Sequence, residues 1–450
     1  MIKVSVILAV YNGAPYLREC LDSIMAQTLK DIEVICVNDA STDSTHEILN
    51  EYAEQIMILT NDHNLMAGES RNRGFAEAQG EYVIFLDADD VFEPDMLEKA
   101  YHKAQIGDVQ VCIFKENQFF GNSGRYMRYP YAQRIMDALG KKAFFSPEEI
   151  SDMLFNLWNG WAWDKLFQRQ FLLEKNLKFP DIKTSEDGFL VHAALASAKR
   201  IALVNEELVH HRIGNINSVS NTRSEAWESC FIYLRELREH LVCSGLLKMY
   251  ERSFVNWSCE FLYWNYQTIH EKVRSSFSLE LQNYMIHELH IEKYGFEYFY
   301  NAFSFQFVQN VISGGRGYIP ISEQDKFRIS YCLNKKKLEE LRLYFIKDKW
   351  KIALWGAGIR GQAFMEIYAG KWNMVYCIFD MDKEKQGNDT YSGIKIRPFN
   401  IEQTGDIDCI LVLNSAHIPF VKRLLTDKPI AVFDLNSYLT LPQSIEACFL

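Results

Sequence analysis

The segment 81–90, with the sequence EYVIFLDADD, constrains the fold more than any other part of the chain. Its apolar run, rich in β-branched and aromatic residues, stops at three carboxylates, those of Asp87, Asp89 and Asp90. Such a run is typical of a buried strand in a parallel sheet, and ligands of open α/β sheets bind beyond the carboxyl ends of the strands. Clustered carboxylates repel one another unless a cation joins them, and their oxygen atoms favour Mg²⁺ or Mn²⁺. A solvated turn before an acidic helix start is the alternative interpretation.

Strand-like and helix-like segments alternate through the first hundred residues. Apolar runs predict strands at residues 3–10, 33–37, 56–59 and 82–86. Apolar residues at helical spacing fill the intervals at residues 14–27, 45–52 and 70–78. The second of these helices is expected to begin with a capping box formed by Ser44 and Glu47. Repeated βα units predict an α/β fold with a parallel, doubly wound sheet that carries helices on both faces.

The length of the chain predicts more than one domain, because 450 residues exceed the usual size of a single core. We expect an α/β domain at 1–222, in which the pattern of strands and helices becomes irregular after residue 108, so that the doubly wound sheet as a whole should be mixed. A helical, aromatic-rich region should follow at 223–347, and a small Rossmann-like α/β domain at 348–450. Aromatic residues of the middle region recur at helical spacing, namely Trp257, Phe261 and Trp264. They predict either a buried core stripe or a platform for an acceptor.

Composition limits the partners and the compartment. The chain has 48 basic and 59 acidic residues, and its net charge of -11 argues against nucleic-acid binding. Ten cysteines without paired spacing indicate reduced thiols and a cytoplasmic protein. No apolar run has the length of a membrane span, and the first residues lead directly into a strand, so neither a span nor a secretory signal is expected. Peripheral membrane contact and homo-oligomer formation stay open.

Several motifs of the first domain occur in a recognisable order. They are VSVILAVYNG (4–13), VNDASTD (37–43), SRNRG (70–74), FLDADD (85–90), WDKLF (163–167), EDGF (186–189) and HR (211–212). This series resembles the family 2 glycosyltransferases, inverting enzymes of the GT-A fold that use nucleotide-diphosphate sugars. The resemblance extends to about residue 220, half of the chain. It implies a metal-dependent glycosyltransferase that builds a bacterial-type surface polysaccharide or glycolipid.

The resemblance implies a nucleotide-sugar site, with a UDP-sugar as the expected donor. Its candidate residues are Ala9, Tyr11, Asn12, Asp39, Arg71, Asp87 and Arg212. Asp39 would accept hydrogen bonds from uracil or ribose, and Arg71 would contact the nucleotide or its phosphates. The alternatives are a turn or cap role for Asp39 and a solvated surface position for Arg71.

A metal ion is the expected cofactor of this site. The resemblance makes Asp89 its ligand and Asp90 a secondary candidate, with Mn²⁺ or Mg²⁺ stabilising the charge that grows on the leaving diphosphate. It also allows a histidine near residue 211 to join the metal, and we name His211. His210 is adjacent, so the sequence does not say which ring faces the site, and a buried structural histidine is the alternative.

The catalytic base implied by the resemblance is Asp187, which would take the proton of the attacking acceptor hydroxyl. Glu186 beside it would shape the acceptor site. A helix N-terminus with favourably placed carboxylates is the alternative for both, and the two interpretations are compatible. Trp163 and Lys165 resemble the acceptor-side segment of the family, with core packing as the alternative for Trp163.

Two positions depart from the family pattern. Ala9 stands where proline is common, which a strand tolerates easily. Ala40 stands where glycine is common, which is harder to accept if the turn requires a positive φ.

A second glycine motif opens the last domain. Gly356, Gly358 and Gly361 follow a strand-like run and start a helix, and Asp380 ends the next strand at the Rossmann distance. Backbone N–H groups at this helix start could hold NAD or a nucleotide, and a structural or oligomerisation role is the alternative. For the whole protein, the alternatives are an NAD-linked sugar-modifying oxidoreductase and a non-catalytic nucleotide-sugar-binding scaffold.

Overall fold

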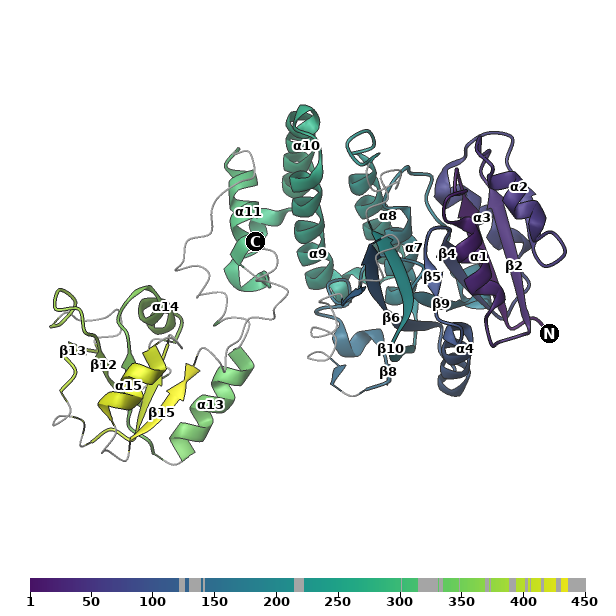
Figure 1. Ribbon diagram of the computed structural model, residues 1–450. Coiled ribbons are helices and arrows are strands. Elements are labelled where there is room, and N and C mark those ends of the chain that lie inside the picture. Colours follow the sequence, from purple (N-terminus) through teal and green to yellow (C-terminus); the bar gives the residue numbers. More distant parts are fainter. Residues whose placement is uncertain are drawn as a thin grey trace. The chain divides into compact units, whose positions relative to one another are not determined.

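The computed structural model divides into two compact units, Met1–Tyr284 and Met285–Leu450 (Figure 1). The boundary between them falls inside the predicted helical region, so the predicted division at residues 222 and 347 stays a prediction. The structure describes residues 1–120, 126–128, 139–140, 142–213, 222–300, 302–314, 335–347, 349–368, 374–387, 394–400, 406–413, 417–425 and 430–435, and residues 331, 372 and 404.

The first unit is built on a mixed sheet whose described strands follow the order β3-β2-β1-β4-β9-β6-β10-β5, with β7 beside β6 and β8 beside β10. The strands are β1 (Val4–Val10), β2 (Ile32–Asn38), β3 (Met57–Thr60), β4 (Tyr82–Asp87), β5 (Val91–Phe92), β6 (Val111–Phe120), β7 (Tyr126–Arg128), β8 (Phe144–Phe145), β9 (Lys165–Gln168) and β10 (Ile201–Ile213). Strands β3, β2, β1 and β4 are parallel, whereas β9 is antiparallel to both of its neighbours. The predicted α/β class with a doubly wound, mixed sheet is confirmed.

Helices cover the two faces of this sheet. They are α1 (Leu17–Met25), α2 (Thr45–Glu51), α3 (Met66–Glu77), α4 (Met96–Gly107), α6 (Arg169–Glu174) and α7 (Glu186–Ser197), with a 3₁₀ turn at Pro147–Ile150. Apolar side chains of α1 and α4 form one buried core with β1, β2 and β4. On α3, Gly74 permits close packing, because a Cβ atom there would lie 2.7 Å from Ile7 Cγ2. This glycine therefore lets α3 pack closely against the sheet. Arg71 lies one turn earlier on the same helix.

The start of α2 corrects one expectation. Ser44 makes no side-chain cap hydrogen bond, so the predicted capping box is wrong. The carboxylate of Asp43 instead accepts the Thr45 N–H at 3.0 Å and the Thr45 hydroxyl at 2.5 Å. Asp43, and not Ser44, therefore bonds the first backbone N–H of the helix, and a carboxylate is the stronger acceptor.

Strand register brings the site together. Ala9 pairs with Val37 on one side and with Asp87 on the other, so β1, β2 and β4 end at the same edge of the sheet. Residues that follow these strands therefore meet at that edge, as they do in other parallel sheets.

Three further helices complete the first unit, namely α8 (Ser229–Cys243), α9 (Leu247–Thr268) and α10 (Glu271–Asn283). Trp257 and Phe261 of α9 stack at a centroid distance of 5.5 Å and are half-buried, and the Trp257 indole donates to the Tyr233 hydroxyl at 2.8 Å. Trp264 is 46% exposed. The aromatic stripe is thus partly core, and its use as an acceptor platform stays a prediction.

The second unit contains a five-stranded sheet in the order β13-β12-β11-β14-β15, all of whose described pairs are parallel. Its strands are β11 (Ile352–Trp355), β12 (Val375–Phe379), β13 (Ile396–Arg397), β14 (Cys409–Val412) and β15 (Ala431–Asp434). Its helices are α11 (Ala302–Ile312), α13 (Lys335–Lys347), α14 (Ile359–Tyr368) and α15 (Ile418–Leu424), with short 3₁₀ helices at Ile291–Lys293 and Phe296–Tyr298. A short π-helix at Tyr284–Glu288 begins at the last residue of the first unit. In chain order the strands run 3-2-1-4-5, which is the order found in dinucleotide-binding sheets.

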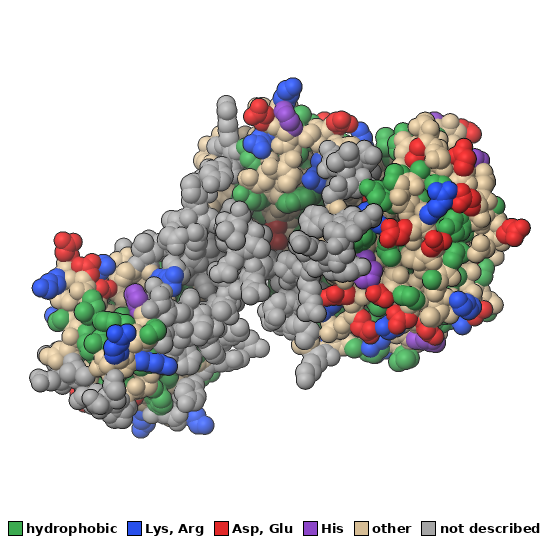
Figure 2. Space-filling model, in the orientation of Figure 1, with side chains coloured by type: hydrophobic (Ala, Val, Ile, Leu, Met, Phe, Trp, Pro, Cys, Tyr) green, Lys and Arg blue, Asp and Glu red, His purple; other side chains and the backbone are tan. Residues whose placement is uncertain are grey.

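The surface of the described residues carries both acidic and basic side chains (Figure 2), as expected from a chain with 48 basic and 59 acidic residues. On the face drawn in Figure 2, acidic and basic side chains of the first unit are interspersed. Among the described residues, none of the helices combines the length and the hydropathy that crossing a bilayer requires.

Candidate active site

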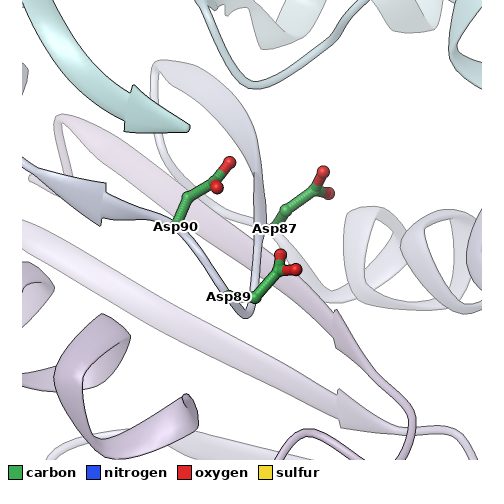
Figure 3. A group of neighbouring side chains, drawn as sticks. All are labelled: Asp87, Asp89 and Asp90. Atoms are coloured by element: carbon green, nitrogen blue, oxygen red, sulfur yellow. The ribbon is translucent and has the colours of Figure 1, made fainter. Parts of the chain in front are cut away.

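Three carboxylates gather at the turn between β4 and β5 (Figure 3). Asp87 ends β4, Asp89 lies at the tip of the turn, and one ligand oxygen from each of Asp87, Asp89 and Asp90 lies within 4.8 Å of the others. Asp87 and Asp89 are half-buried, whereas Asp90 is fully buried. An all-oxygen set with this spacing fits a hard divalent cation such as Mg²⁺ or Mn²⁺.

The buried carboxylate of Asp90 is bonded to neighbouring residues of β10. Its carboxylate oxygens lie 3.1 and 3.2 Å from His211 Nδ1, and Oδ1 also accepts the Arg212 N–H at 2.8 Å. Burial raises the pKa of Asp90 to about 6, although the neighbouring His211 opposes the rise. The two half-buried carboxylates, Asp87 and Asp89, are therefore the ones better placed for a ligand.

The structure decides which histidine faces the site. The ring of His211 stacks on Trp163 at a centroid distance of 5.1 Å, whereas His210 contacts Asn117 at 2.7 Å and Glu93 at 2.9 Å. Burial lowers the pKa of His211, but the hydrogen bond and charge of Asp90 outweigh this effect and raise the pKa to about 9. With Nδ1 at Asp90, only Nε2 would be left for a metal, and it would first have to lose its proton. Metal ligation by His211 stays a prediction.

Arg212 fastens the acidic turn. Its Nε donates to the Asp89 carbonyl at 2.8 Å, and its Nη2 contacts Glu19 at 2.6 Å. The guanidinium is buried between the rings of Tyr16 and Phe119, at 4.6 and 4.5 Å. In this arrangement Arg212 positions Asp89, and the predicted contact with a diphosphate stays a prediction.

Arg71 is the centre of the charged site. It is only 6% exposed, so the alternative of a solvated surface arginine is wrong. Its Nη2 contacts Asp87 at 2.6 Å, while its Nη1 contacts Glu186 at 2.9 Å and Asp187 at 2.7 Å. The same guanidinium lies 5.3 Å from the ring of Phe179. A single cation therefore joins the acidic turn to the start of α7, and the predicted nucleotide contact stays a prediction.

Asp187 has the environment of a general base. Its Oδ1 accepts from Arg71, and its Oδ2 accepts the Ala162 N–H at 3.3 Å. Burial is the largest effect on its pKa, which it raises to about 7 with help from the charges of Glu186 and Asp87, against the opposing Arg71. A carboxylate with a pKa near neutrality can accept a proton at physiological pH and later release it.

The first turn beyond β1 is held by short polar side chains. Ser41 Oγ accepts the Asn12 N–H at 3.0 Å, and Thr45 Oγ1 accepts the Gly13 N–H at 2.9 Å. These anchors were not among the predicted site residues, although the polar run that follows β2 was a signal for them. Tyr11 is 53% exposed at this edge. The turn after β1 is thus held by the segment that follows β2. It exposes the ring of Tyr11, on which a nucleotide base could stack.

Asp39 lies buried at the end of β2. Its Oδ1 accepts hydrogen bonds from Asn61 Nδ2 and from the Leu65 N–H, both at 2.7 Å. The next residue, Ala40, has a φ of 57°, so the turn does require the conformation in which glycine is unstrained. The predicted turn chemistry is present, and the predicted contact of Asp39 with a nucleotide stays a prediction.

Comparison with known proteins agrees with this geometry. Residues 5–158 match the model of the family described as glycosyl transferase family 2. This N-terminal part of the chain belongs to glycosyl transferase family 2. The recognition of the family from its motifs is thereby confirmed.

Two relatives show the extent of the family 2 likeness in sequence. The chain is 32% identical over 234 residues to the putative glycosyltransferase EpsH of Bacillus subtilis, covering 50% of this chain and 65% of that protein. It is 30% identical over 231 residues to the cholesterol galactosyltransferase of Borreliella burgdorferi, covering 48% and 62%. The chain thus spans less than two thirds of either relative. Residues 1–349 of S. aureus TarS, in complex with UDP-GlcNAc, have 19% identity and a TM-score of 0.46 over 71% of this chain and 95% of that one.

The two residues that were predicted to contact the acceptor, Trp163 and Lys165, are both buried. Trp163 is 2% exposed and stacks on Trp161 at 4.8 Å, and Lys165 is fully buried. Trp161 is the ring of this pair that is partly exposed, and it was not among the predicted site residues. Its place two residues before Trp163 was the signal that could have indicated it, because residues i and i+2 of an extended segment share a face.

The glycine motif lies outside the family 2 match, in the second unit. Gly356 has a φ of 104°, and a Cβ atom on Gly361 would lie 2.1 Å from the Gly356 carbonyl oxygen. Asp380 directly follows β12, and its carboxylate accepts the N–H groups of Ala357 at 2.7 Å and Asp382 at 2.8 Å. Asp380 therefore fastens the loop, and nucleotide binding by Gly356, Gly358, Gly361 and Asp380 stays a prediction.

Proposed function

We propose that the chain is a metal-dependent, inverting glycosyltransferase. It would move a sugar from a nucleoside-diphosphate donor, a UDP-sugar, to a hydroxyl of a glycan or glycolipid in bacterial-type surface polysaccharide synthesis. The observation that carries this proposal is the contact of Arg71 with Asp87 on the donor side and with Asp187 on the acceptor side. This arrangement supports a single site in which the nucleotide-sugar donor lies close to the catalytic base, Asp187.

The donor half of the proposed site lies at the ends of β1, β2 and β4. Tyr11 would stack on the base, with Ala9 and Asn12 lining the same edge. Asp39 would accept from the nucleotide base or the ribose through Oδ2, because Asn61 and the Leu65 N–H both bond to its Oδ1. Asp87 would contact the ribose, which suits its half-buried position.

A divalent cation fits the acidic turn, because the three carboxylates offer only oxygen ligands at suitable mutual distances. Asp89 would be the principal protein ligand, with its backbone held by Arg212. When bound, Mn²⁺ or Mg²⁺ would neutralise charge on the departing diphosphate. The residues of the chain would supply its coordination and orient the donor.

The base of the proposed reaction is Asp187. Its carboxylate would accept the proton of the acceptor hydroxyl while that oxygen bonds to the anomeric carbon. The bond from this carbon to the diphosphate oxygen breaks on the opposite side, so the anomeric configuration inverts. Arg71 would keep the base oriented, and Glu186 would shape the space for the acceptor. Burial raises the pKa of Glu186, against the opposing charge of Arg71.

The acceptor side is proposed to contact Trp161, whose ring is partly exposed, while the buried Trp163 supports it from behind. Aromatic rings in such positions suit both sugar rings and lipid groups, since each presents an apolar face. The relative named as a cholesterol galactosyltransferase supports acceptors that carry a lipid group.

A nucleotide-binding role for the second unit is a separate proposal. The parallel sheet and the glycine loop support it, whereas the use of Asp380 to fasten the loop favours a structural role. An NAD-linked oxidoreductase would need this loop to bind a dinucleotide.

The proposed function is tested with a panel of UDP- and GDP-sugars. Release of the nucleoside diphosphate is measured with Mn²⁺, with Mg²⁺ and with a chelator, and the anomeric configuration of a transferred sugar is read by NMR. We expect one donor to be consumed only with metal present and to give an inverted product. Retention of configuration, or full activity in the chelator, would contradict the mechanism.

A further inference from the structure

Residues 159–162 form a short segment that is fastened by a buried ammonium group. Lys165 is fully buried, and its Nζ donates to the carbonyls of Asn159 at 3.1 Å and Trp161 at 2.8 Å. Its third bond, at 2.5 Å, goes to a carboxylate oxygen of Asp164. An ammonium carries three protons, so these bonds use its whole donor capacity. In this structure the Lys165 ammonium thus binds the backbone of the segment that precedes it in the chain. It is not available to an acceptor.

The other side of the segment contacts the start of α7. The Ala162 N–H donates to Oδ2 of Asp187 at 3.3 Å, while Oδ1 of the same carboxylate accepts from Arg71. Gly160 and Gly188 allow the segment to approach α7 closely, because a Cβ atom on Gly160 would lie 2.8 Å from the Cα atom of Gly188. The segment therefore touches both the carboxylate of Asp187 and the backbone that carries it.

We propose that Lys165 and Gly160 are positioning residues, which hold Asp187 toward the acceptor through the segment 159–162. The proposal rests on the proposed function, since it needs Asp187 to be the base. A carboxylate bonded through a single oxygen can rotate about its last side-chain bond, and a partner on each oxygen fixes its plane. A displacement of about 1 Å at a reacting group can lower a rate by about 100-fold, so this fixation matters to catalysis.

The charged groups around Asp187 come from three elements. Arg71 reaches it from α3, Glu186 precedes it on α7, and Asp87 acts from the end of β4. The Lys165 ammonium bonds to other groups, so its removal would act on Asp187 through the segment. Loss of the Ala162 hydrogen bond would destabilise the ionised carboxylate and move its pKa upward.

A purely structural role for Lys165 is the competing explanation, since the lysine also neutralises the buried Asp164. That role predicts a lower melting temperature with unchanged kinetics of the folded protein. The positioning role predicts a change in kcat and in the pH profile, with nucleotide binding preserved.

The experiment compares Lys165→Met and Gly160→Ala in the full chain. Their matched controls are Lys99→Met, which removes a partly exposed ammonium bound to Asp95 and Glu206, and Gly295→Ala, where the three atoms nearest to the new methyl group belong to the end of the Glu297 side chain. Melting temperature, UDP affinity by calorimetry, and kcat and KM for transfer from the donor found in the panel are measured from pH 5 to 9.

We expect both test variants to lower kcat by about 10- to 100-fold while UDP affinity changes by less than about twofold. The acid limb of the kcat/KM profile should move to higher pH, and both controls should behave as wild type. Gly160→Ala acts from the opposite side of the segment, so it decides the question if Lys165→Met fails to fold. Folded variants with wild-type kcat and pH profile would overturn the positioning role. If the wild type consumed no nucleotide sugar, the proposed function itself would fail.

Discussion

The guanidinium of Arg71 lies 2.7 Å from the carboxylate of Asp187, and its other terminal nitrogen lies 2.6 Å from Asp87. These three side chains come from α3, α7 and the end of β4. The cation therefore links the part of the site that would hold the donor to the part that would deprotonate the acceptor. Without it, several carboxylates would share a buried space uncompensated.

Replacing this cation should affect both folding and catalysis. We expect Arg71→Met to lower the free energy of unfolding by about 3 to 5 kcal/mol, because it leaves buried carboxylates without a partner. Arg71→Lys should be milder, since it keeps the charge and loses the fork that reaches both sides. Denaturant unfolding and transfer assays measure the two effects. Arg18→Met, at an exposed ion pair with Glu51, is the control and should change neither quantity.

The pH dependence of the reaction should report Asp187. The base works in its deprotonated form, so kcat/KM should fall as the pH drops through about 7, the value to which burial raises the pKa of this carboxyl. Asp187→Asn should lower kcat by about 100- to 10,000-fold, the usual contribution of a general base. Initial rates from pH 5 to 9 test both statements. An acid limb near pH 4 would mean that burial does not control this group.

Removal of the proposed metal ligand should be distinguishable from loss of fold. We expect Asp89→Asn to lower the affinity for Mn²⁺ in the presence of UDP by at least about 100-fold, more than the loss of an outer-shell partner usually causes. Calorimetric titration with Mn²⁺ measures the affinity, and circular dichroism checks the fold. Asp95→Asn, whose carboxylate pairs with Lys99 outside the acidic turn, is the control. Unchanged Mn²⁺ affinity in Asp89→Asn would exclude this ligand assignment.

The backbone at Ala40 predicts a stabilising substitution. Its φ of 57° strains a residue with a Cβ atom, so Ala40→Gly should raise the free energy of unfolding by up to about 1 kcal/mol. Ala76→Gly, on an exposed position of helix α3, should instead lower it by about 1 kcal/mol. Opposite signs for one chemical change would show that the local φ is responsible. Thermal and denaturant unfolding provide the comparison.

In the second unit, the glycine loop predicts a contrast between two positions. Gly361→Ala should destabilise the unit, because the new methyl group would lie 2.1 Å from the Gly356 carbonyl oxygen. Gly358→Ala should fold normally, since no atom of the described residues other than its neighbours in the chain lies within 4 Å of the position of its Cβ. Differential scanning calorimetry measures both. Added NAD, NADP or UDP-sugar should raise the melting temperature of the wild type if the loop binds that ligand.

Much of the fold of the first unit could be predicted from local patterns. The strands at residues 3–10 and 82–86 are present within two residues of their predicted bounds, because buried parallel strands are continuous apolar runs. The carboxylates after β4 were predicted to gather, and they do, because the chain turns at once and keeps them close in sequence. Local chemistry was less reliable at Ser44, because the carboxylate of Asp43, and not the serine side chain, bonds a backbone N–H group at the start of α2.

The environments of the site residues were harder to predict. Arg71 is 115 residues from Glu186 in the chain, and no periodicity or spacing reports a contact over that distance. The choice between His210 and His211 depends on which face of β10 packs against Trp163. The burial of Lys165 similarly depends on strand β9 lying between β4 and β6, a pairing that the motif itself does not encode.

By itself, the sequence determined the family 2 motifs, the α/β class and the position of the carboxylates at the ends of strands, because these follow from residue types and local periodicity. Only the tertiary structure decided that Arg71 is buried between Asp87 and Asp187, that Asp90 is committed to His211, and that Trp161 is more exposed than Trp163. Each of these outcomes depends on contacts between distant segments. Their energies come from burial and charge pairing, which exist only after the sheet and its helices have assembled.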